Sequence, residues 1–526
     1  MIASVLLFAA APTVVNIVNF ARGSEPRNPS MDLVAPLREE IALNTRHSLP
    51  NTLLFQYDAL LRDDMMAEAH KADPSLTEFG VWIEMCRQLV ERVGIAWRGR
   101  EGWDWDWHVN PGFLMAYTPA ERAKILDEVF RLFRERFGAW PKSMGSWLLD
   151  AKSMEYVRGK YGVKAFCICR EQDNTDAYGL RGGFFNGAYY PSRRNALSAA
   201  VDFRNAVAAP CFRMLTPDPI YNYSEESLTT QFGRTTGSAY TMEPVGRFGR
   251  EKDIVDWYFR VYSHPASINL SYMQTGQENS FGWPRIKEGL ERQIEKIAAE
   301  RDAGRVRVER LCDTAADFMR RFPDRTPPQA QIALEDWNGT GNRSVWYNSR
   351  FYRVNVVDEK GKLYFRDIHV MKDDFDEPNL DSACAAWKTD YFTPPVVDLY
   401  LANRKLAKGP IVLGDGFVSL SAEAVGADAL RVTAHGIGGK TVQIVFREDS
   451  IEMSGASFVG FSCGENSLTF ADGYRYSVRV DRCADGTERM SFGKPADDCV
   501  SACETCIGES TVMPKSRCPS MSEIML

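Results

Sequence analysis

Two glutamates near the ends of predicted strands have neighbours that would suit them to acid–base chemistry. Glu171 follows Arg170, a cation that would keep a nearby carboxylate ionised, as a nucleophile or base requires. Glu278 lies among polar and aromatic residues, where partial burial would raise its pKa and suit a general acid. Hydrolysis of a glycosidic bond needs one carboxyl of each kind. The sequence therefore predicts Glu171 and Glu278 as a catalytic pair.

Further acids follow other predicted strands. A single acid after a strand is more often a helix N-cap or a solvated loop residue. However, the carboxyl ends of the strands in a parallel barrel meet at one face, where active sites lie. We therefore expect Asp58 and Asp150 to join the catalytic pair, and Glu84 and Asp173 to contact the substrate.

Aromatic residues make up 12% of the chain, and several cluster in loop-like stretches. Their rings could stack on the apolar faces of sugars, although an ordinary large core would also account for them. The other predicted substrate-binding residues are Trp103, Trp105, Trp107, His108, Trp147, Tyr189, Gln277 and Trp283.

Metal and nucleotide chemistry have weaker support. The chain has 6 histidines without an HxxxH or HExxH pairing, and His108, which follows Asp104 and Asp106, is the one plausible ligand. Gly182-Gly183 lacks the remaining glycines of a dinucleotide fingerprint. We expect no metal and no other cofactor.

Short apolar runs alternate with amphipathic helical stretches, such as Pro119–Phe137, between Asn51 and Gly282. This pattern is typical of βα units around a parallel sheet. It predicts an α/β fold, with a (β/α) barrel of seven or eight strands over residues 45–325. The expected strands are Thr52–Leu60, Glu78–Glu84, Lys142–Asp150, Val163–Arg170, Phe212–Leu215 and Ile268–Gln274.

The pattern changes after one long predicted helix, Lys287–Arg321, and the linker Thr326-Pro327-Pro328. Strand-like segments joined by Gly- and Asp-containing turns then predict an antiparallel β-sandwich over residues 330–495. Its expected strands are Ser344–Val357, Lys362–Met371, Ile411–Leu420, Ala429–Thr433, Thr441–Arg447, Ser467–Phe470 and Tyr474–Val480.

The two ends of the chain differ from the rest. Residues 1–24 resemble the apolar region of a secretory signal, which would be removed and would leave no membrane span. The expected location is therefore outside the cell or in the periplasm and envelope. Residues 496–526 form a tail whose cysteines could form disulfides in an exported protein or a metal knuckle in a cytosolic one. Their CxxxCxxC spacing lacks the paired CxxC arms of a zinc site, which favours disulfides or no bond.

The overall composition limits the classes of partner. Hydrophobic residues make up 44% and charged residues 25%, which is ordinary for a globular protein. The net charge of −7 argues against nucleic acid, since phosphate binding needs a basic surface. An oligo- or polysaccharide fits this surface better.

Five segments near the strand ends carry a resemblance to known proteins: Gln56-Tyr57-Asp58, Gly80-Val81-Trp82-Ile83-Glu84, Gly145-Ser146-Trp147-Leu148-Leu149-Asp150, Arg170-Glu171-Gln172 and Gly276-Gln277-Glu278-Asn279-Ser280-Phe281-Gly282-Trp283. The chain resembles a two-domain family of exported bacterial proteins whose barrel is similar to those of polysaccharide deacetylases and family-57 glycoside hydrolases. The family-57 resemblance implies a mid-barrel nucleophile at Glu171 and a late acid at Glu278. It departs at the first strand, where this chain has Gln56 and Asp58 in place of a histidine pair.

These features together favour a carbohydrate-active hydrolase that cleaves glycosidic bonds with two carboxylates. A polysaccharide deacetylase-like enzyme is the alternative, although deacetylases hold a metal with one Asp and two His, and this chain has no such histidine pair. A catalytically inactive, glycan-binding barrel is the third interpretation.

Overall fold

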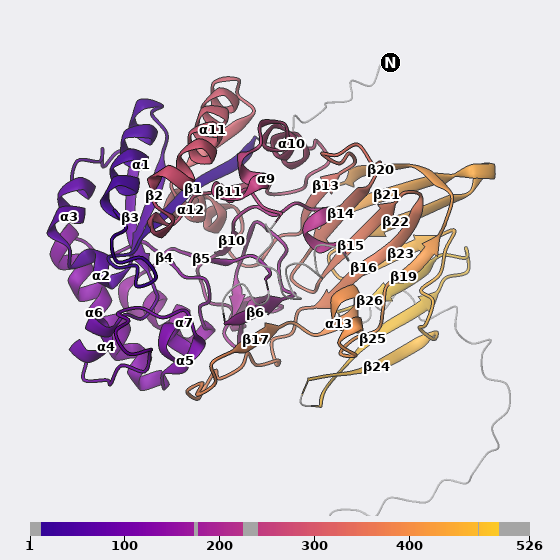
Figure 1. Cartoon of the computed structure of the whole chain (residues 1–526). Helices are drawn as coiled ribbons and strands as arrows, with labels where there is room; N and C mark the ends of the chain where they lie inside the picture. Colours follow the sequence, from indigo (N-terminus) through magenta and orange to yellow (C-terminus); the bar gives the residue numbers. More distant parts are fainter. Residues whose placement is uncertain (1–11, 173–176, 225–239, 472, 494–526) are drawn as a thin grey trace, which may run out of the picture.

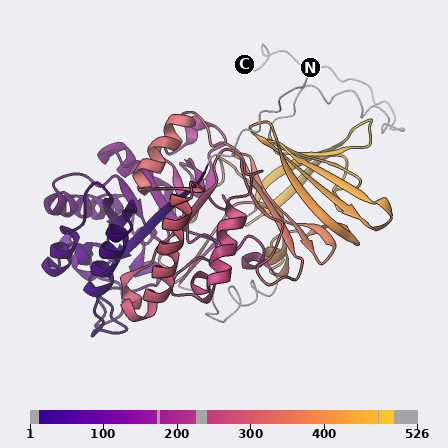
Figure 2. The ribbon, with the colours of Figure 1, turned by 90° about the horizontal axis from the view of Figure 1, so that it is seen from above.

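The computed structural model describes residues 12–172, 177–224, 240–471 and 473–493. Two parts lie side by side along the molecule (Figures 1 and 2). The first is a parallel sheet with surrounding helices, and the second consists of antiparallel strands. The change between them falls between Arg321 and Gln329. The predicted class, an α/β barrel followed by a β-sandwich, is confirmed.

One curved sheet of nine strands forms the centre of the first part, in the order β11-β1-β2-β3-β4-β5-β10-β7, with β12 also paired to β1. All of its pairings are parallel except that of β7 with β10. The backbone N–H of Thr216, just after β10, donates to the carbonyl of Gln274 in β11 at 3.2 Å, which links the two ends of the curl. The strands are β1 Thr13–Ala21, β2 Asn51–Phe55, β3 Thr77–Trp82, β4 Ser143–Gly145, β5 Ala165–Cys169, β7 Ala188–Tyr189, β10 Cys211–Met214, β11 Tyr272–Thr275 and β12 Val306–Glu309.

Alternate residues of these strands point into the barrel, where Val18, Leu54, Trp82 and Phe212 share one core. The other face packs against the surrounding helices. These helices are α1 Val34–Arg46, α2 Tyr57–Leu60, α3 Asp63–Ala69, α4 Arg87–Arg92, α5 Val109–Gly112, α6 Pro119–Phe137, α7 Ala151–Tyr161, α9 Arg247–Arg250, α10 Lys252–Tyr262, α11 Trp283–Asp302 and α12 Leu311–Arg321.

Helix α6 has the predicted bounds because its local signals are strong. Thr118 and Glu121 form a capping box, and Pro119 occupies the first turn. Gly138 ends the helix in the left-handed conformation, with φ of 74°.

The N-terminal apolar stretch requires a correction. Residues 13–21 form the buried strand β1, which pairs with β2, β11 and β12. The sequence of a strand that is covered on both faces is a nearly continuous apolar run. A secretory signal has the same composition, and for this reason residues 1–24 were predicted to be a removable segment. The barrel therefore begins ahead of residue 45. Residues 1–11 lie outside the described residues.

The single long helix predicted over Lys287–Arg321 is also wrong. Helix α11 ends at Asp302, and Gly304 then adopts a left-handed φ of 73°. The alternating Val306 and Val308 follow in β12, which pairs with β1, before α12 begins. Helix α12 packs Leu311, Ala315 and Phe318 into the barrel core.

The second part contains two antiparallel sheets that share one apolar core, as the sandwich prediction requires. Ser344–Val357 and Ile411–Leu420, each predicted as one strand, are each two strands separated by a turn. The first sheet holds β13 Gln329–Ala333, β14 Arg343–Asn348, β15 Tyr352–Glu359, β16 Lys362–Val370, β18 Pro395–Asp398 and β19 Ile411–Gly414. The second holds β20 Phe417–Val425, β21 Ala429–Gly436, β22 Thr441–Phe446, β23 Ser450–Ser454, β24 Gly464–Phe470, β25 Tyr474–Arg482 and β26 Glu488–Ser491. The cysteine-containing tail over 496–526 lies outside the described residues.

A pair of short strands joins the barrel part to the antiparallel part. Strand β17, Thr389–Phe392, leaves the antiparallel part and pairs in parallel with β6, Tyr178–Arg181, of the barrel part. The remaining short elements are β8 Pro191–Ser192, β9 Asn195–Ala199 and α13 Leu399–Asn403.

Among the helices of the described ranges, none combines the length and hydropathy that a membrane crossing requires.

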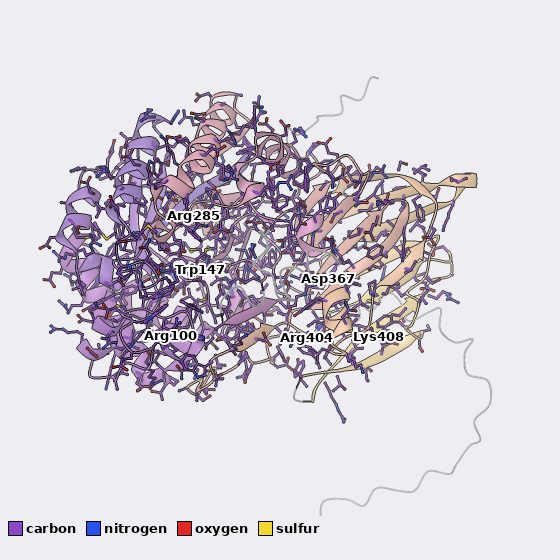
Figure 3. All side chains as sticks on the ribbon, in the orientation of Figure 1. Arg100, Trp147, Arg285, Asp367, Arg404 and Lys408 are labelled. Carbon is purple, nitrogen blue, oxygen red and sulfur yellow. The ribbon has the colours of Figure 1, made fainter. Side chains whose placement is uncertain are left out.

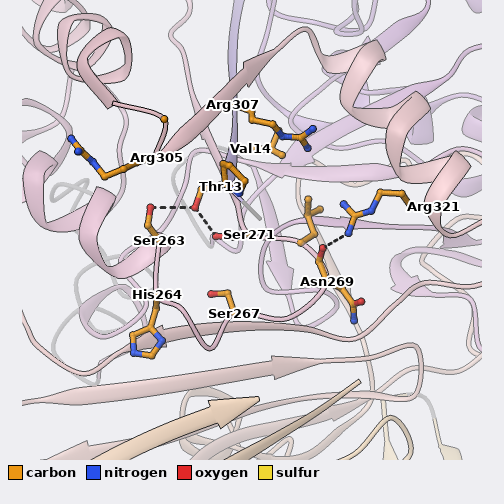
Figure 4. Close-up of a pocket in the computed structure, with 13 residues that line it drawn as sticks. Thr13, Val14, Ser263, His264, Ser267, Asn269, Ser271, Arg305, Arg307 and Arg321 are labelled. Carbon is orange, nitrogen blue, oxygen red and sulfur yellow. Dashed lines mark hydrogen bonds between the residues drawn. The ribbon is translucent and has the colours of Figure 1, made fainter. Parts of the chain in front are cut away.

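A hollow of about 330 Å³ lies at the N-terminal ends of β1, β11 and β12, opposite the strand ends that carry the predicted site (Figure 4). Arg305, Arg307 and Arg321 line it, but Glu300, Glu309 and Asp317 lie within ion-pair distance of these cations. The hollow therefore offers no concentrated charge for a ligand.

Candidate active site at the barrel mouth

Three charged residues meet where β1, β3 and β11 end, and we call this face the barrel mouth. Arg22 follows β1, Glu84 follows β3 and Glu278 follows β11. The Nη2 atom of Arg22 lies 2.7 Å from Oε2 of Glu84, and its Nη1 atom contacts Oε2 of Glu278. The three residues are 2%, 2% and 5% exposed. The structure thus brings together two predicted acids through an arginine that sequence analysis had assigned to the removable segment.

Burial controls the electrostatics of this cluster. Burial raises the pKa of Glu278, and the positive charge of Arg22 opposes that rise while the negative charge of Glu84 adds to it. Burial alone would lower the pKa of Arg22, but the charges of Glu278 and Glu84 raise it instead. Arg22 therefore stays a cation, and its charge favours the ionised form of Glu278.

Aromatic rings flank the cluster. The Trp82 Nε1–H donates to Oε2 of Glu84 at 2.6 Å. The Phe20 ring stacks on Trp82 with 3.7 Å between centroids, and half-buried Trp147 meets both rings edge-on. The Arg22 guanidinium lies over Trp105, 4.2 Å from the ring centroid. The mouth thus combines carboxylates with apolar ring faces.

A second carboxylate, Glu243, lies close to Glu278 and was missed by the sequence analysis. The side-chain amide of Gln277 donates to Oε1 of Glu243 at 3.2 Å and accepts from the backbone N–H of Val245 at 3.0 Å. Burial raises the pKa of Glu243, and the negative charge of Glu278 adds to that rise while Arg170 opposes it. Glu243 stands in a loop before α9, where no pattern of residues marks a site.

Several buried polar groups near the strand ends have atoms without a partner among the described residues. Among them are both amide atoms of Gln56, after β2, and Nε of Arg170, after β5. Gln56 continues the inward-facing alternation of Leu54 in the strand. Buried polar atoms usually find a partner, so these groups are suited to hold water or a polar ligand.

Glu171, the other half of the predicted pair, belongs to a different cluster. Its Oε1 atom lies 2.9 Å from Nη2 of Arg353, in β15 of the antiparallel part, and accepts from the backbone N–H of Gly182. Among the described residues, it has no ion-pair or hydrogen-bond partner in common with Glu278. Glu171 and Glu278 therefore have separate partners, since Arg353, the nearest cation of Glu171, comes from the antiparallel sheet. Their action as a catalytic pair stays a prediction.

Asp58 and Asp150 have structural partners. Asp58 accepts from the backbone N–H of Gly23 at 2.9 Å and from the Ser24 hydroxyl at 2.8 Å, which fixes the turn after β1. Asp150 caps α7 by accepting from the Ser153 N–H at 2.9 Å. Asp150 is therefore a helix N-cap, which the sequence analysis gave as the alternative to a functional role.

The remaining predicted residues divide among core, loop and mouth. Tyr189 is buried, and its hydroxyl donates to the carbonyl of Ala196 at 2.7 Å, so it is a core residue. Half-buried Trp283 begins α11 and packs against the outer face of the barrel. Trp103, Trp107 and His108 form a loop cluster beside Trp105. Asp173 lies outside the described residues.

Metal binding can be tested against the donor atoms. Within the described ranges, one group of potential ligands stands close together, Asp367, His369 and Asp398, and it lies in the antiparallel part (Figure 3 labels Asp367). Oδ2 of Asp398 already lies 2.8 Å from both the His369 ring and Nε of Arg181. At the mouth, Arg22 supplies the positive charge between the carboxylates. Neither arrangement fits a metal held by one Asp and two His.

Comparison with known proteins supports the fold. No family model and no curated protein sequence match the chain. A solved structure from Parabacteroides distasonis, described as a candidate glycoside hydrolase/deacetylase, matches with a TM-score of 0.55 and 12% identity, over 74% of this chain and 92% of its own. The barrel resemblance predicted from the sequence is thus confirmed as a likeness of fold.

Two further structures match more weakly. A candidate polysaccharide deacetylase from Pseudomonas aeruginosa has 15% identity and a TM-score of 0.33, over 60% of this chain and 93% of its own. A GH57 branching enzyme from Thermococcus kodakaraensis has 10% identity and a TM-score of 0.30, over 59% of this chain and 71% of its own.

Proposed function

We propose that this chain is a carbohydrate-active hydrolase that cleaves glycosidic bonds at the barrel mouth, with Glu278 and Glu243 as its two carboxylates. The observation that carries the proposal is the position of Glu278. One of its oxygens is held by Arg22, and it follows β11 at the face where barrel enzymes place their chemistry, while the side chain of Gln277 donates to Glu243.

The two acids have environments that suit different roles. Burial raises the pKa of Glu278 as it does that of Glu243, but among the described residues only Glu278 of the two is in direct contact with a cation. Arg22 and the Ser280 hydroxyl hold it and oppose that rise, which suits a nucleophile or base. Glu243 has a pKa raised by burial and by the charge of Glu278, so it keeps its proton more readily. Glu243 protonates the leaving oxygen, and Glu278 attacks the sugar or activates water.

The surroundings of the pair suit a sugar. The exposed part of Trp147 offers an apolar face to a pyranose ring, while Gln56 and Arg170 carry the unpartnered polar atoms that hydroxyl groups require. The name of the Parabacteroides neighbour agrees with this class of substrate, although that agreement is an analogy of fold.

A glycan-binding barrel without activity is the second candidate. It is favoured by the ion pair itself, since Arg22 engages both Glu84 and Glu278 and could hold them as a structural cluster. A metal-dependent deacetylase has no comparable support, because the donor atoms at the mouth do not fit its metal.

A screen of nitrophenyl glycosides and natural glycans tests the proposal. Glu278→Gln and Glu243→Gln should each lower kcat by about 10²- to 10⁴-fold, because an amide keeps the shape but cannot protonate the leaving oxygen and cannot act as a nucleophile or base. Glu135→Gln is the matched control, since Glu135 is an exposed residue of α6. Hydrolysis that persists at the wild-type rate in both mouth variants would exclude these residues as the catalytic pair.

A further inference from the structure

A row of rings leads from the mouth to the surface and ends at a tryptophan from the antiparallel part of the chain. Trp105, under Arg22, lies 6.0 Å from Trp107 between ring centroids. Trp107 stacks on His108 at 5.6 Å, and His108 meets Trp387 edge-on at 4.4 Å. The row thus begins under Arg22, the ion-pair partner of Glu278, and ends at Trp387 in a loop of the antiparallel part.

The far end of the row is held in place by both parts of the molecule. The backbone N–H of Val109 donates to the carbonyl of Trp387 at 3.0 Å, which fixes the loop of the antiparallel part against the barrel. Asp106 is fully buried and lies 2.8 Å from Nδ1 of His108, which fixes the orientation of that ring. The rings are therefore positioned before any ligand binds.

The charges along the row are paired. Arg100 lies between Trp103 and Trp107, 3.6 and 4.0 Å from their centroids, and its charge is balanced by Asp106 at 2.9 Å. Arg27 pairs with Glu25 in the same way. A surface of rings with balanced charge suits a neutral ligand with apolar faces.

Exposure distinguishes Trp387 from the other rings. It is 49% exposed, whereas Trp105 is 2% exposed and Trp107 is half-buried. Trp140 is also exposed, at 36%, but it lies on Tyr161 and under Arg134, away from this row. Trp387 is therefore the exposed tryptophan that continues the row from the mouth, and Trp140 is an exposed tryptophan outside the row.

We infer that Trp107, His108 and Trp387 form a second sugar-binding surface that holds a neutral oligo- or polysaccharide along the row while one of its residues occupies the mouth. The inference rests on the proposed function and narrows its substrate class, because a single sugar would reach the mouth without touching Trp387. The antiparallel part would then contribute directly to substrate binding.

The test compares Trp387→Ala with Trp140→Ala on neutral glycans of increasing length. Loss of one stacking surface should raise KM about 3- to 10-fold for Trp387→Ala, and this effect should grow with chain length. Trp387→Phe should recover most of the loss, because it keeps an aromatic face. Thermal unfolding of each variant checks that the fold is intact.

Binding is measured separately by electrophoresis through gels that contain each polysaccharide, in a Glu278→Gln background. Retardation that Trp387→Ala abolishes and Trp140→Ala keeps would support the inference, even if no hydrolysis is found and the proposed activity fails. Equal behaviour of the two tryptophan variants, beside normal hydrolysis of short glycosides, would overturn the inference alone. If the wild type neither cleaves nor binds any glycan, both proposals fail.

Discussion

Glu171 of the barrel part and Arg353 of the antiparallel part form a buried ion pair, with 2.9 Å between Oε1 and Nη2. The same Nη2 atom lies 2.8 Å from Oδ2 of Asp367, so one guanidinium contacts two acids. Arg181, from β6, approaches Asp398 to 2.8 Å in the same network. Buried ion pairs therefore join the barrel part to the antiparallel part.

Arg353→Met should destabilise the protein by about 3–5 kcal/mol, because it leaves the buried acids Glu171 and Asp367 with only Arg181 to share between them. The free energy of unfolding in urea measures the change. Arg131→Met is the control, since Arg131 is an exposed residue of α6 whose ion pairs should contribute about 0–1 kcal/mol. Equal losses in the two variants would show that the buried network does not stabilise the contact.

The same pair predicts a dependence of stability on pH. Burial alone would raise the pKa of Glu171, but the charges of Arg353 and Arg181 lower it to about 2, from an ordinary value of 4.5. A lowered carboxylate pKa means that the unfolded chain binds a proton first, so stability is present above the ordinary value and is lost as pH falls toward 2.

Urea unfolding at pH 7, 4.5 and 3 checks this dependence. The wild type should lose stability between pH 4.5 and 3, and Glu171→Gln should lose less over the same interval, although it is less stable at pH 7. A pH dependence that is the same in both proteins would assign the acid sensitivity to other groups.

Some of this structure could be predicted because its signals are local. The bounds of α6 follow from Thr118, Pro119 and Gly138, which act within a few residues of the helix ends. The change to antiparallel strands near residue 329 also follows from alternation and turn residues. Long, strongly patterned elements are specified by their own residues.

The site was harder to predict because its contacts are distant in sequence. Arg22 and Glu278 are 256 positions apart, and Glu171 and Arg353 are 182 apart. Arg22 follows an apolar strand that has the composition of a signal segment, so it was set aside. Glu243 gained its role only because the fold places its loop beside Gln277.

Treatment with a chelator should leave activity unchanged. Arg22 already pairs with two of the carboxylates at the mouth, Glu84 and Glu278, and the donor set there does not fit a metal held by histidines. The hydrolysis rate before and after dialysis against a chelator measures this. Loss of activity that zinc restores would favour the deacetylase-like alternative and a different set of residues.

Arg22→Met should shift the acid limb of the pH profile of kcat/KM upward. The positive charge of Arg22 lowers the pKa of Glu278, so its removal raises that pKa, and a higher pH is then needed to ionise the nucleophile or base. Arg22→Lys keeps a charge near both acids and should shift the limb less. The profile of Glu243→Gln should keep its acid limb, because that limb reports Glu278. An acid limb that stays in place in Arg22→Met would show that Glu278 is not the group that must be ionised.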